Sequence, residues 1–121
     1  MKNSTDNREV GRKGEDIACD FLKEKDFEII KRNYRFQRAG EIDIIVKKDN
    51  LIVFVEVKNR KTSDYGGALY SISNRKKRTL RKIAYHFLSA HPQYHSKDFL
   101  YRFDLISIFN GKIEWIDDII R

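Results

Sequence analysis

The sequence has one cysteine, one proline and no apolar run near the roughly 20 residues that a membrane helix needs. The single cysteine, Cys19, excludes a framework of internal disulfides and is typical of a reducing compartment. The first 14 residues, MKNSTDNREVGRKG, lack the apolar stretch of a secretory signal. We therefore expect a cytoplasmic protein that does not associate with a membrane.

Positive charge is in excess. The chain has 25 lysines and arginines against 18 acidic residues, a formal net charge of +7. This balance favours polyanionic partners, chiefly nucleic acid. Apolar residues make up 40% of the chain, which excludes compositional disorder, and 121 residues suffice for one compact domain. We expect a flexible N-terminus at residues 1–8 and a single domain at residues 9–121.

Apolar spacing predicts the secondary structure. Residues from Val10 onward repeat at three- and four-residue intervals and predict an amphipathic helix, followed by strands at 27–36, 41–48 and 51–58. The paired glycines in TSDYGGA, residues 62–68, indicate a loop. The order α-β-β-β-α-β-β that results predicts an α/β (α+β) fold with a mixed sheet and helices packed against it.

The C-terminal half has clearer local signals. A second helix is expected at residues 73–90, with Ser73 as its N-cap. Its buried stripe would consist of Leu80, Ile83, Ala84, Phe87 and Leu88. Two final strands surround Asn110-Gly111, a dipeptide that favours a two-residue hairpin turn.

Charged residues interrupt the predicted hairpin at residues 41–58. If Asp49-Asn50 closes it as a two-residue loop, Lys48 faces Leu51. The same register pairs Asp43 with Glu56 and Glu41 with Lys58, so that these four charges share one face. The opposite, apolar face would then be formed by Ile42, Ile44, Val46, Val53, Val55 and Val57.

Two carboxylates in that position repel each other. At roughly 5 Å and an effective dielectric constant near 20, the repulsion is about 3 kcal/mol, more than a cross-strand pair supplies. Lys58 or a bound divalent cation would offset it, since hard cations prefer carboxylate oxygens. A strand face exposed to water, with splayed carboxylates and a weak Glu41–Lys58 ion pair, is the simpler structural alternative.

GEID at 40–43 and FVEVKNR at 54–60 resemble the bipartite PD-(D/E)xK motif of restriction-endonuclease-like nucleases. The chain as a whole resembles the small YraN-like bacterial family of that fold. The shared pattern continues in GRKGEDIA, RNYR, YGGA, SNRKKRTLRKIA, RFDLI and WIDD, in that order along the chain. Ile42 occupies the position of the motif's proline. The resemblance implies a restriction-endonuclease-like core.

The resemblance also implies roles for individual residues. Asp43 and Glu56 would bind Mg²⁺ or Mn²⁺ together with the backbone carbonyl of Val57. Lys58 would orient the attacking water or stabilise charge at the phosphate. Glu15, in the first helix, would complete the catalytic set, and Gly11 and Gly14 would allow that helix to approach the sheet closely. Glu41 is an additional carboxylate that would pair with Lys58 or act as a peripheral ligand.

Basic residues are concentrated in RKKRTLRK, residues 75–82, where six of eight positions are lysine or arginine. The predicted nucleic-acid contacts are Lys76, Lys77, Arg78, Arg81, Lys82 and Arg60. A charged, solvated helix face is the structural alternative. Lys76 lies four residues before Leu80 and would continue the buried stripe.

Two functional classes follow. The first is a metal-dependent nuclease that cleaves phosphodiester bonds, with structure-specific cleavage of DNA by a homodimer as one form. The second is a non-catalytic nucleic-acid-binding module that retains the nuclease fold. Only the first needs a metal at Asp43 and Glu56, whereas both use the basic surface.

Overall fold

The computed structural model describes the backbone of residues 4–60 and 72–120, and the side chains of residues 12–60 and 72–120. Helix α1 begins at Ser4, upstream of Val10, where the predicted apolar pattern starts. The loop expected at residues 62–68, with Gly66 and Gly67, lies outside the described residues. The elements are α1 (Ser4–Glu24), β1 (Glu28–Phe36), β2 (Gly40–Lys48), β3 (Leu51–Arg60), α2 (Asn74–Ala90), a 3₁₀ turn η2 (Pro92–Tyr94), β4 (Leu100–Phe109) and β5 (Lys112–Ile116).

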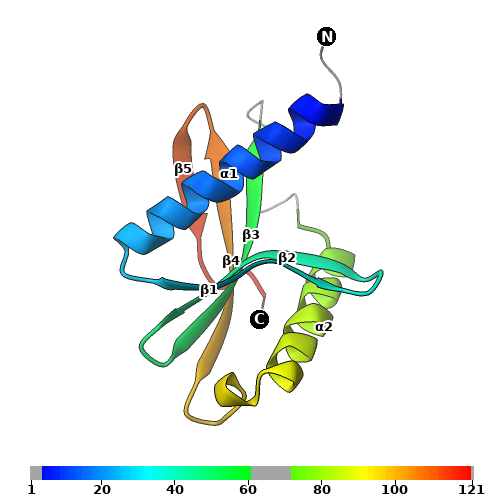
Figure 1. The fold of residues 1–121 in the computed structure, drawn as a ribbon, viewed down its shortest axis with the longest axis vertical. Coiled ribbons are helices and arrows are strands. Elements are labelled where there is room, and N and C mark those ends of the chain that lie inside the picture. The colour runs from blue at the N-terminus through cyan, green and yellow to red at the C-terminus, as the bar shows by residue number, and fades with distance from the viewer. Residues whose placement is uncertain (1–3, 61–71, 121) are drawn as a thin grey trace.

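The strands form one mixed sheet in the order β1-β2-β3-β4-β5. Neighbouring strands are antiparallel except β3 and β4, which are parallel and connected through the segment that contains α2. The predicted α+β fold and its element order are confirmed. Figure 1 shows α1 running across one face of the sheet, while the β1–β2 hairpin extends over the N-terminal half of α2. No helix in the described part of the chain combines the length and apolar character needed to span a membrane.

The sheet separates two apolar cores. The α1-side core contains Ala18, Cys19 and Leu22 of the helix together with Ile44, Val46, Val53, Val55, Ile106 and Ile108 of the sheet. The α2-side core contains Ile42, Ile45, Ile52, Phe54 and Leu105 together with the predicted stripe of α2. The central strands are buried on both faces, which explains their nearly continuous runs of branched apolar residues.

The predicted stripe and cap of α2 are confirmed. The buried side chains of the helix are Leu80, Ile83, Ala84, Phe87 and Leu88. The hydroxyl of Ser73 accepts a hydrogen bond from the backbone N–H of Lys76 at 3.0 Å, which satisfies one of the free donors at the start of the helix. The start of α2 and its buried face therefore both follow from local features of the sequence, the Ser73 cap and the spacing of the apolar residues.

The predicted β2–β3 register holds for only part of the hairpin. Lys48 faces Leu51, as expected, and the paired positions continue as far as Ile44 and Val55. The ladder ends there, so the predicted pairings of Asp43 with Glu56 and of Glu41 with Lys58 are wrong. Beyond Ile44 the side chain of Asp43, rather than the backbone of β2, contacts β3.

The end of the β2–β3 ladder coincides with a change of face in both β1 and β2. Arg32 contacts α1, whereas Tyr34, two residues later, packs on α2. Ile44 likewise belongs to the α1-side core and Ile42 to the α2-side core. Residues two apart normally share a face of a strand, so both strands reverse their faces here. The prediction that Ile42 shares a face with Ile44 is therefore wrong.

Asn33 lies at the point of reversal. Its φ is +52°, a left-handed conformation that asparagine tolerates better than most residues. Arg32 pairs with Ile44 and Tyr34 with Ile42, so Asn33 lies across from Asp43. The alternation of side chains between the two faces of β1 is thus broken at Asn33. Asn33 lies opposite Asp43, the first residue of β2 beyond the end of the β2–β3 ladder.

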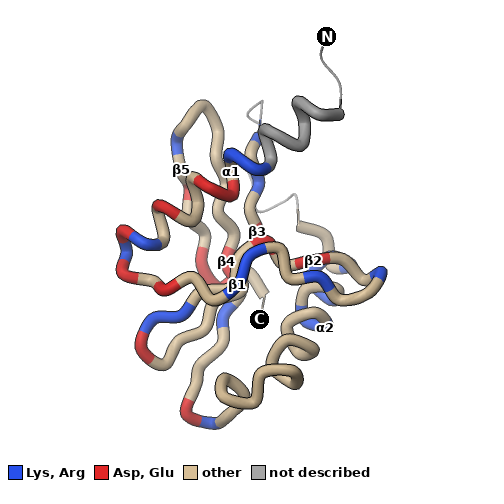
Figure 2. Tube along the Cα trace, in the orientation of Figure 1, with Lys and Arg blue, Asp and Glu red and all other residues tan. Residues whose placement is uncertain are grey.

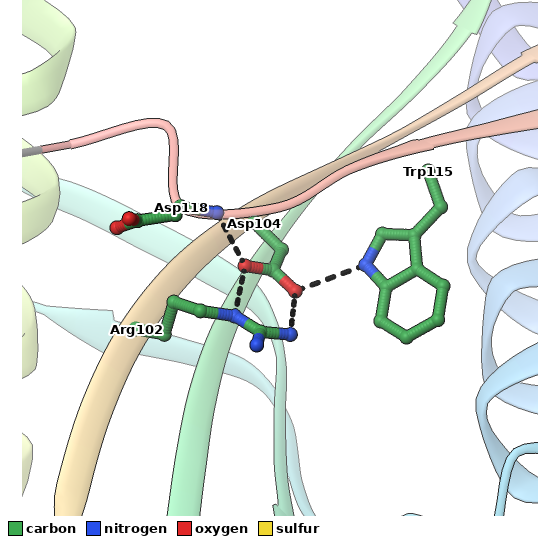
Figure 3. Close-up of polar contacts among 4 residues, drawn as sticks. All are labelled: Arg102, Asp104, Trp115 and Asp118. Atoms are coloured by element: carbon green, nitrogen blue, oxygen red, sulfur yellow. Dashed lines mark hydrogen bonds and ion pairs between the residues drawn. The ribbon is translucent and has the colours of Figure 1, made fainter.

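The β4–β5 hairpin closes as predicted at Asn110-Gly111, both with positive φ, and Trp115 pairs with Ile106. Behind the hairpin, Asp104 is fully buried and accepts four hydrogen bonds (Figure 3). The donors are Nε and Nη2 of Arg102, Nε1 of Trp115 and the backbone N–H of Asp118. These bonds hold the segment after β5 in place as it crosses to the α2-side core, where Ile119 and Ile120 are buried.

Replacing Asp104 should destabilise the fold strongly. In Asp104→Ala the Arg102 guanidinium and the Trp115 indole N–H lose their shared acceptor, and we expect a loss of about 3–5 kcal/mol in the free energy of unfolding. Urea unfolding monitored by Trp115 fluorescence measures this loss. Asp117→Ala, an exposed carboxylate in the same segment, serves as the control and should change stability by less than about 0.5 kcal/mol.

Candidate active site

Asp43 links β2 to β3 through its side chain. Its Oδ2 accepts a hydrogen bond from the backbone N–H of Val57 at 2.8 Å. This bond replaces the ladder contact that β2 no longer makes, so the carboxylate is fixed in place against β3. Asp43 therefore has a structural role in joining β2 to β3, in addition to the metal-binding role that the motif predicts.

Glu56 is the second carboxylate and is 6% exposed. Lys58, on the same strand, and Lys76, in the first turns of α2, place their Nζ atoms 3.8 Å and 3.5 Å from its Oε2. Buried acidic residues are rare unless they are paired, and here two cations converge on one oxygen. The alternative of splayed carboxylates exposed to water does not describe Glu56.

The environment of Asp43 raises its pKa from 3.8 to about 7. Burial is the largest cause, since it disfavours the charged form, and the negative charge of Glu56 is the next. The hydrogen bond from Val57 acts in the opposite direction, while Glu15 and Glu41 add smaller repulsions. Three carboxylates, Glu56, Glu15 and Glu41, thus act on Asp43, although without the predicted strand pairing.

Glu15 reaches this group from α1. The helix can approach because Gly14 packs directly on β3, where an added Cβ would lie 2.8 Å from Cβ of Asn59. The Glu15 side chain is 17% exposed and its Oε1 accepts a hydrogen bond from Nδ2 of Asn33 at 2.9 Å. The expected close approach at Gly14 is confirmed, whereas the side-chain surroundings of Gly11 lie outside the described residues.

The remaining predicted site residues lie on either side of this group. Lys58 forms its ion pair with Glu56 rather than with Glu41. Lys77 is half-buried, whereas Arg78, Arg81 and Lys82 are exposed on α2. Figure 2 shows that basic positions occur both on the β1–β2 hairpin and on the N-terminal half of α2.

Arg60 differs from the exposed residues of the basic set. Its Nε donates a hydrogen bond to Oγ of Ser107 on β4 at 3.0 Å, and its Nη1 is buried without a hydrogen-bond partner. Ser107 is 1% exposed and pairs with Lys58 across the parallel strands. Ser107 therefore holds the Arg60 side chain on the strand next to the one that carries Lys58.

The donor set fits a hard divalent cation. Asp43 and Glu56 offer carboxylate oxygens, and Mg²⁺ is usually held by only one or two carboxylates, with waters and substrate phosphates as its other ligands. Within residues 12–60 and 72–120 no group of three histidine, cysteine or acidic side chains is arranged to hold a metal. A cation here would therefore depend on Asp43, Glu56 and the Val57 carbonyl, the ligands that the family resemblance implies.

Among the contacts of this site that the sequence predictions missed are those from Asn33 to Glu15 and from Arg60 to Ser107. A signal for the first was present, since asparagine is depleted in strands and enriched in left-handed conformations, yet Asn33 lies inside a predicted strand. The second had no comparable signal, because it joins residues 47 positions apart.

The raised pKa of Asp43 predicts a pH-dependent stability. The folded protein keeps the Asp43 proton up to about pH 7, whereas the unfolded chain releases it near 3.8, so stability falls as the pH rises between these values. The upper limit of the effect is about 4 kcal/mol, at about 1.4 kcal/mol per pH unit. In Asp43→Asn this dependence should disappear, and the variant should be more stable than wild type at pH 8. Urea unfolding at pH 5 and pH 8, without divalent cations, tests this, and equal slopes for both proteins would contradict it.

Comparison with known proteins agrees with the resemblance seen in the sequence. Residues 14–108 match the model of the uncharacterised protein family UPF0102. A UPF0102 protein of Caldicellulosiruptor bescii is 46% identical over 107 residues, which cover 87% of each chain. One from Shewanella sediminis is 40% identical over 89% of this chain and 88% of its own, and one from Fusobacterium nucleatum is 34% identical over 93% and 92%. The matches span nearly the whole length of both partners, and the chain belongs to the UPF0102 family.

Proposed function

We propose that the protein is a metal-dependent phosphodiesterase that hydrolyses the backbone of nucleic acid, preferably DNA. The observation that carries this proposal is that the Asp43 and Glu56 carboxylates interact electrostatically where β2 leaves β3, with Lys58 and Lys76 against Glu56. In the absence of a cation, burial and the repulsion from Glu56 disfavour the ionised form of Asp43. Binding of a divalent cation to these carboxylates would offset that repulsion.

Asp43 and Glu56 would hold the cation, together with the carbonyl of Val57. A bound Mg²⁺ or Mn²⁺ supplies polarisation of the scissile phosphate and lowers the pKa of a water molecule. The hydrogen bond from Val57 fixes one oxygen of Asp43, so the carboxylate is preorganised before any ligand arrives. Glu15 adds a further carboxylate from α1, on the side of the site away from α2.

Lys58 and Lys76 have the geometry of charge stabilisers. Each side chain is 37% exposed, so its ammonium group can meet substrate while contacting the buried Glu56. When a cation takes the charge of Glu56, both ammonium groups become available to a phosphate oxygen. Lys58 would then stabilise the charge that develops in the transition state, or hold the attacking water.

The exposed basic residues of α2 would bind the phosphate backbone. Contacts of this kind give affinity that depends strongly on salt and little on sequence. They also motivate the competing function, a nucleic-acid-binding module without catalysis, because Arg78, Arg81 and Lys82 need no metal to contact DNA. The two functions make opposite predictions for Asp43.

Removing Asp43 should abolish catalysis and leave DNA binding intact. We expect saturable binding of Mn²⁺ to the wild type by calorimetry, and Mn²⁺-dependent cleavage of branched or linear DNA. In Asp43→Ala the metal binding should be lost and cleavage should fall by about 100-fold or more. Asp20→Ala, an exposed acidic residue of α1, is the matched control and should behave as wild type.

Neutralising the basic residues should have the converse effect. The variant with Lys77, Arg78, Arg81 and Lys82 changed to glutamine should bind Mn²⁺ as the wild type does. Its DNA affinity should fall, and the salt dependence of binding should become shallower by about 0.9 for each lost phosphate contact. DNA binding without any metal binding or cleavage in the wild type would reject the enzyme and favour the binding module.

A further inference from the structure

Asn33 combines two features that rarely occur together inside a strand. Its backbone is left-handed, with φ +52°, and its side chain donates from Nδ2 to Oε1 of Glu15 at 2.9 Å. The positive φ lies at the residue across from Asp43, where β1 reverses its faces. This conformation costs energy for a residue other than glycine, and such strain is concentrated at functional sites.

Arg32 fixes the same part of α1. Its Nη2 lies 2.8 Å from Oδ1 of Asp16 and 3.6 Å from Oε1 of Glu15. Asn33 and Arg32 therefore both contact Oε1 of Glu15, and neither of these two contacts uses Oε2. The amide holds the carboxylate without adding a charge, so the electrostatic influence of Glu15 on Asp43 is kept.

We propose that Asn33 is a positioning residue of the candidate active site. Its left-handed backbone turns the side chain toward α1, and its amide holds Oε1 of Glu15, so that the carboxylate keeps a fixed place from which it acts on Asp43. This inference rests on the proposed function, because it assigns Asn33 a role at that same site. Asparagine suits the position since it tolerates a positive φ and donates to a carboxylate, a combination that glycine, aspartate and lysine do not offer.

The contact can be tested separately from catalysis. In the NMR spectrum of the wild type, the side-chain amide signal of Asn33, an exposed residue, should shift on Glu15→Gln because the amide loses its carboxylate acceptor. Asn33→Gly then removes the amide but keeps a residue suited to positive φ. Asn110→Gly is the matched control, because Asn110 is also exposed and also has φ +52°, but it lies in the β4–β5 turn.

We expect Asn33→Gly to lower Mn²⁺ affinity or the rate constant kcat for DNA cleavage by about 10- to 100-fold, as loss of an orienting partner does at metal sites. DNA affinity measured without metal should stay at the wild-type value, and the melting temperature should change no more than in Asn110→Gly. Asn33→Asp, whose ionised side chain cannot donate to Glu15, should show the same catalytic loss. A purely structural role would instead lower stability and DNA affinity together.

Three results would overturn the inference in distinguishable ways. An Asn33 amide signal that ignores Glu15→Gln would show that the contact does not exist, whether or not the protein cleaves DNA. If the wild type is active and Asn33→Gly has the same kcat and Mn²⁺ affinity, the contact has no role in the site. A wild type that neither binds Mn²⁺ nor cleaves DNA, with the contact intact, would reject the proposed function itself, and the role of Asn33 with it.

Discussion

The hydrogen bond from the backbone of Val57 to the carboxylate of Asp43 is the contact on which the rest of the site depends. Backbone groups inside a sheet normally satisfy one another, and a strand that leaves the ladder exposes donors that must find other acceptors. Asp43 supplies that acceptor from its side chain. The same bond therefore satisfies a backbone donor of β3 where β2 leaves the ladder, and it fixes a carboxylate at that place.

The change of face in β1 and β2 places residues two positions apart in different cores. Arg32 and Ile44 are directed to α1, while Tyr34 and Ile42 are directed to α2. A strand with unbroken alternation could not make both sets of contacts with residues two positions apart. The cost of the left-handed residue is offset by burial of apolar side chains on either side of it, since each fully buried large side chain contributes about 1.5–3 kcal/mol.

The sequence predicted those features that depend on neighbouring residues. The Ser73 cap, the apolar stripe of α2, both hairpin turns and the register next to each turn rest on contacts within a few positions, and all are confirmed. The pairing beyond Ile44 failed because β1 and β2 both reverse their faces at Asn33 and Asp43, where the β2–β3 ladder has already ended. The buried network around Asp104 was not foreseen, because its partners are brought together only when the segment after β5 folds back.

The parallel pairing of β3 with β4 has a consequence for how the protein folds. Leu51 pairs with Leu100, so this ladder closes a loop of nearly 50 residues, whereas β1, β2 and β3 join through short turns. Closing long loops costs chain entropy before any contact repays it. The three-stranded meander is therefore expected to form early, with its acidic side chains already close, and the arrival of α2 then supplies Lys76. Of the two cations that contact Glu56, Lys58 is thus present in the meander and Lys76 arrives late in folding.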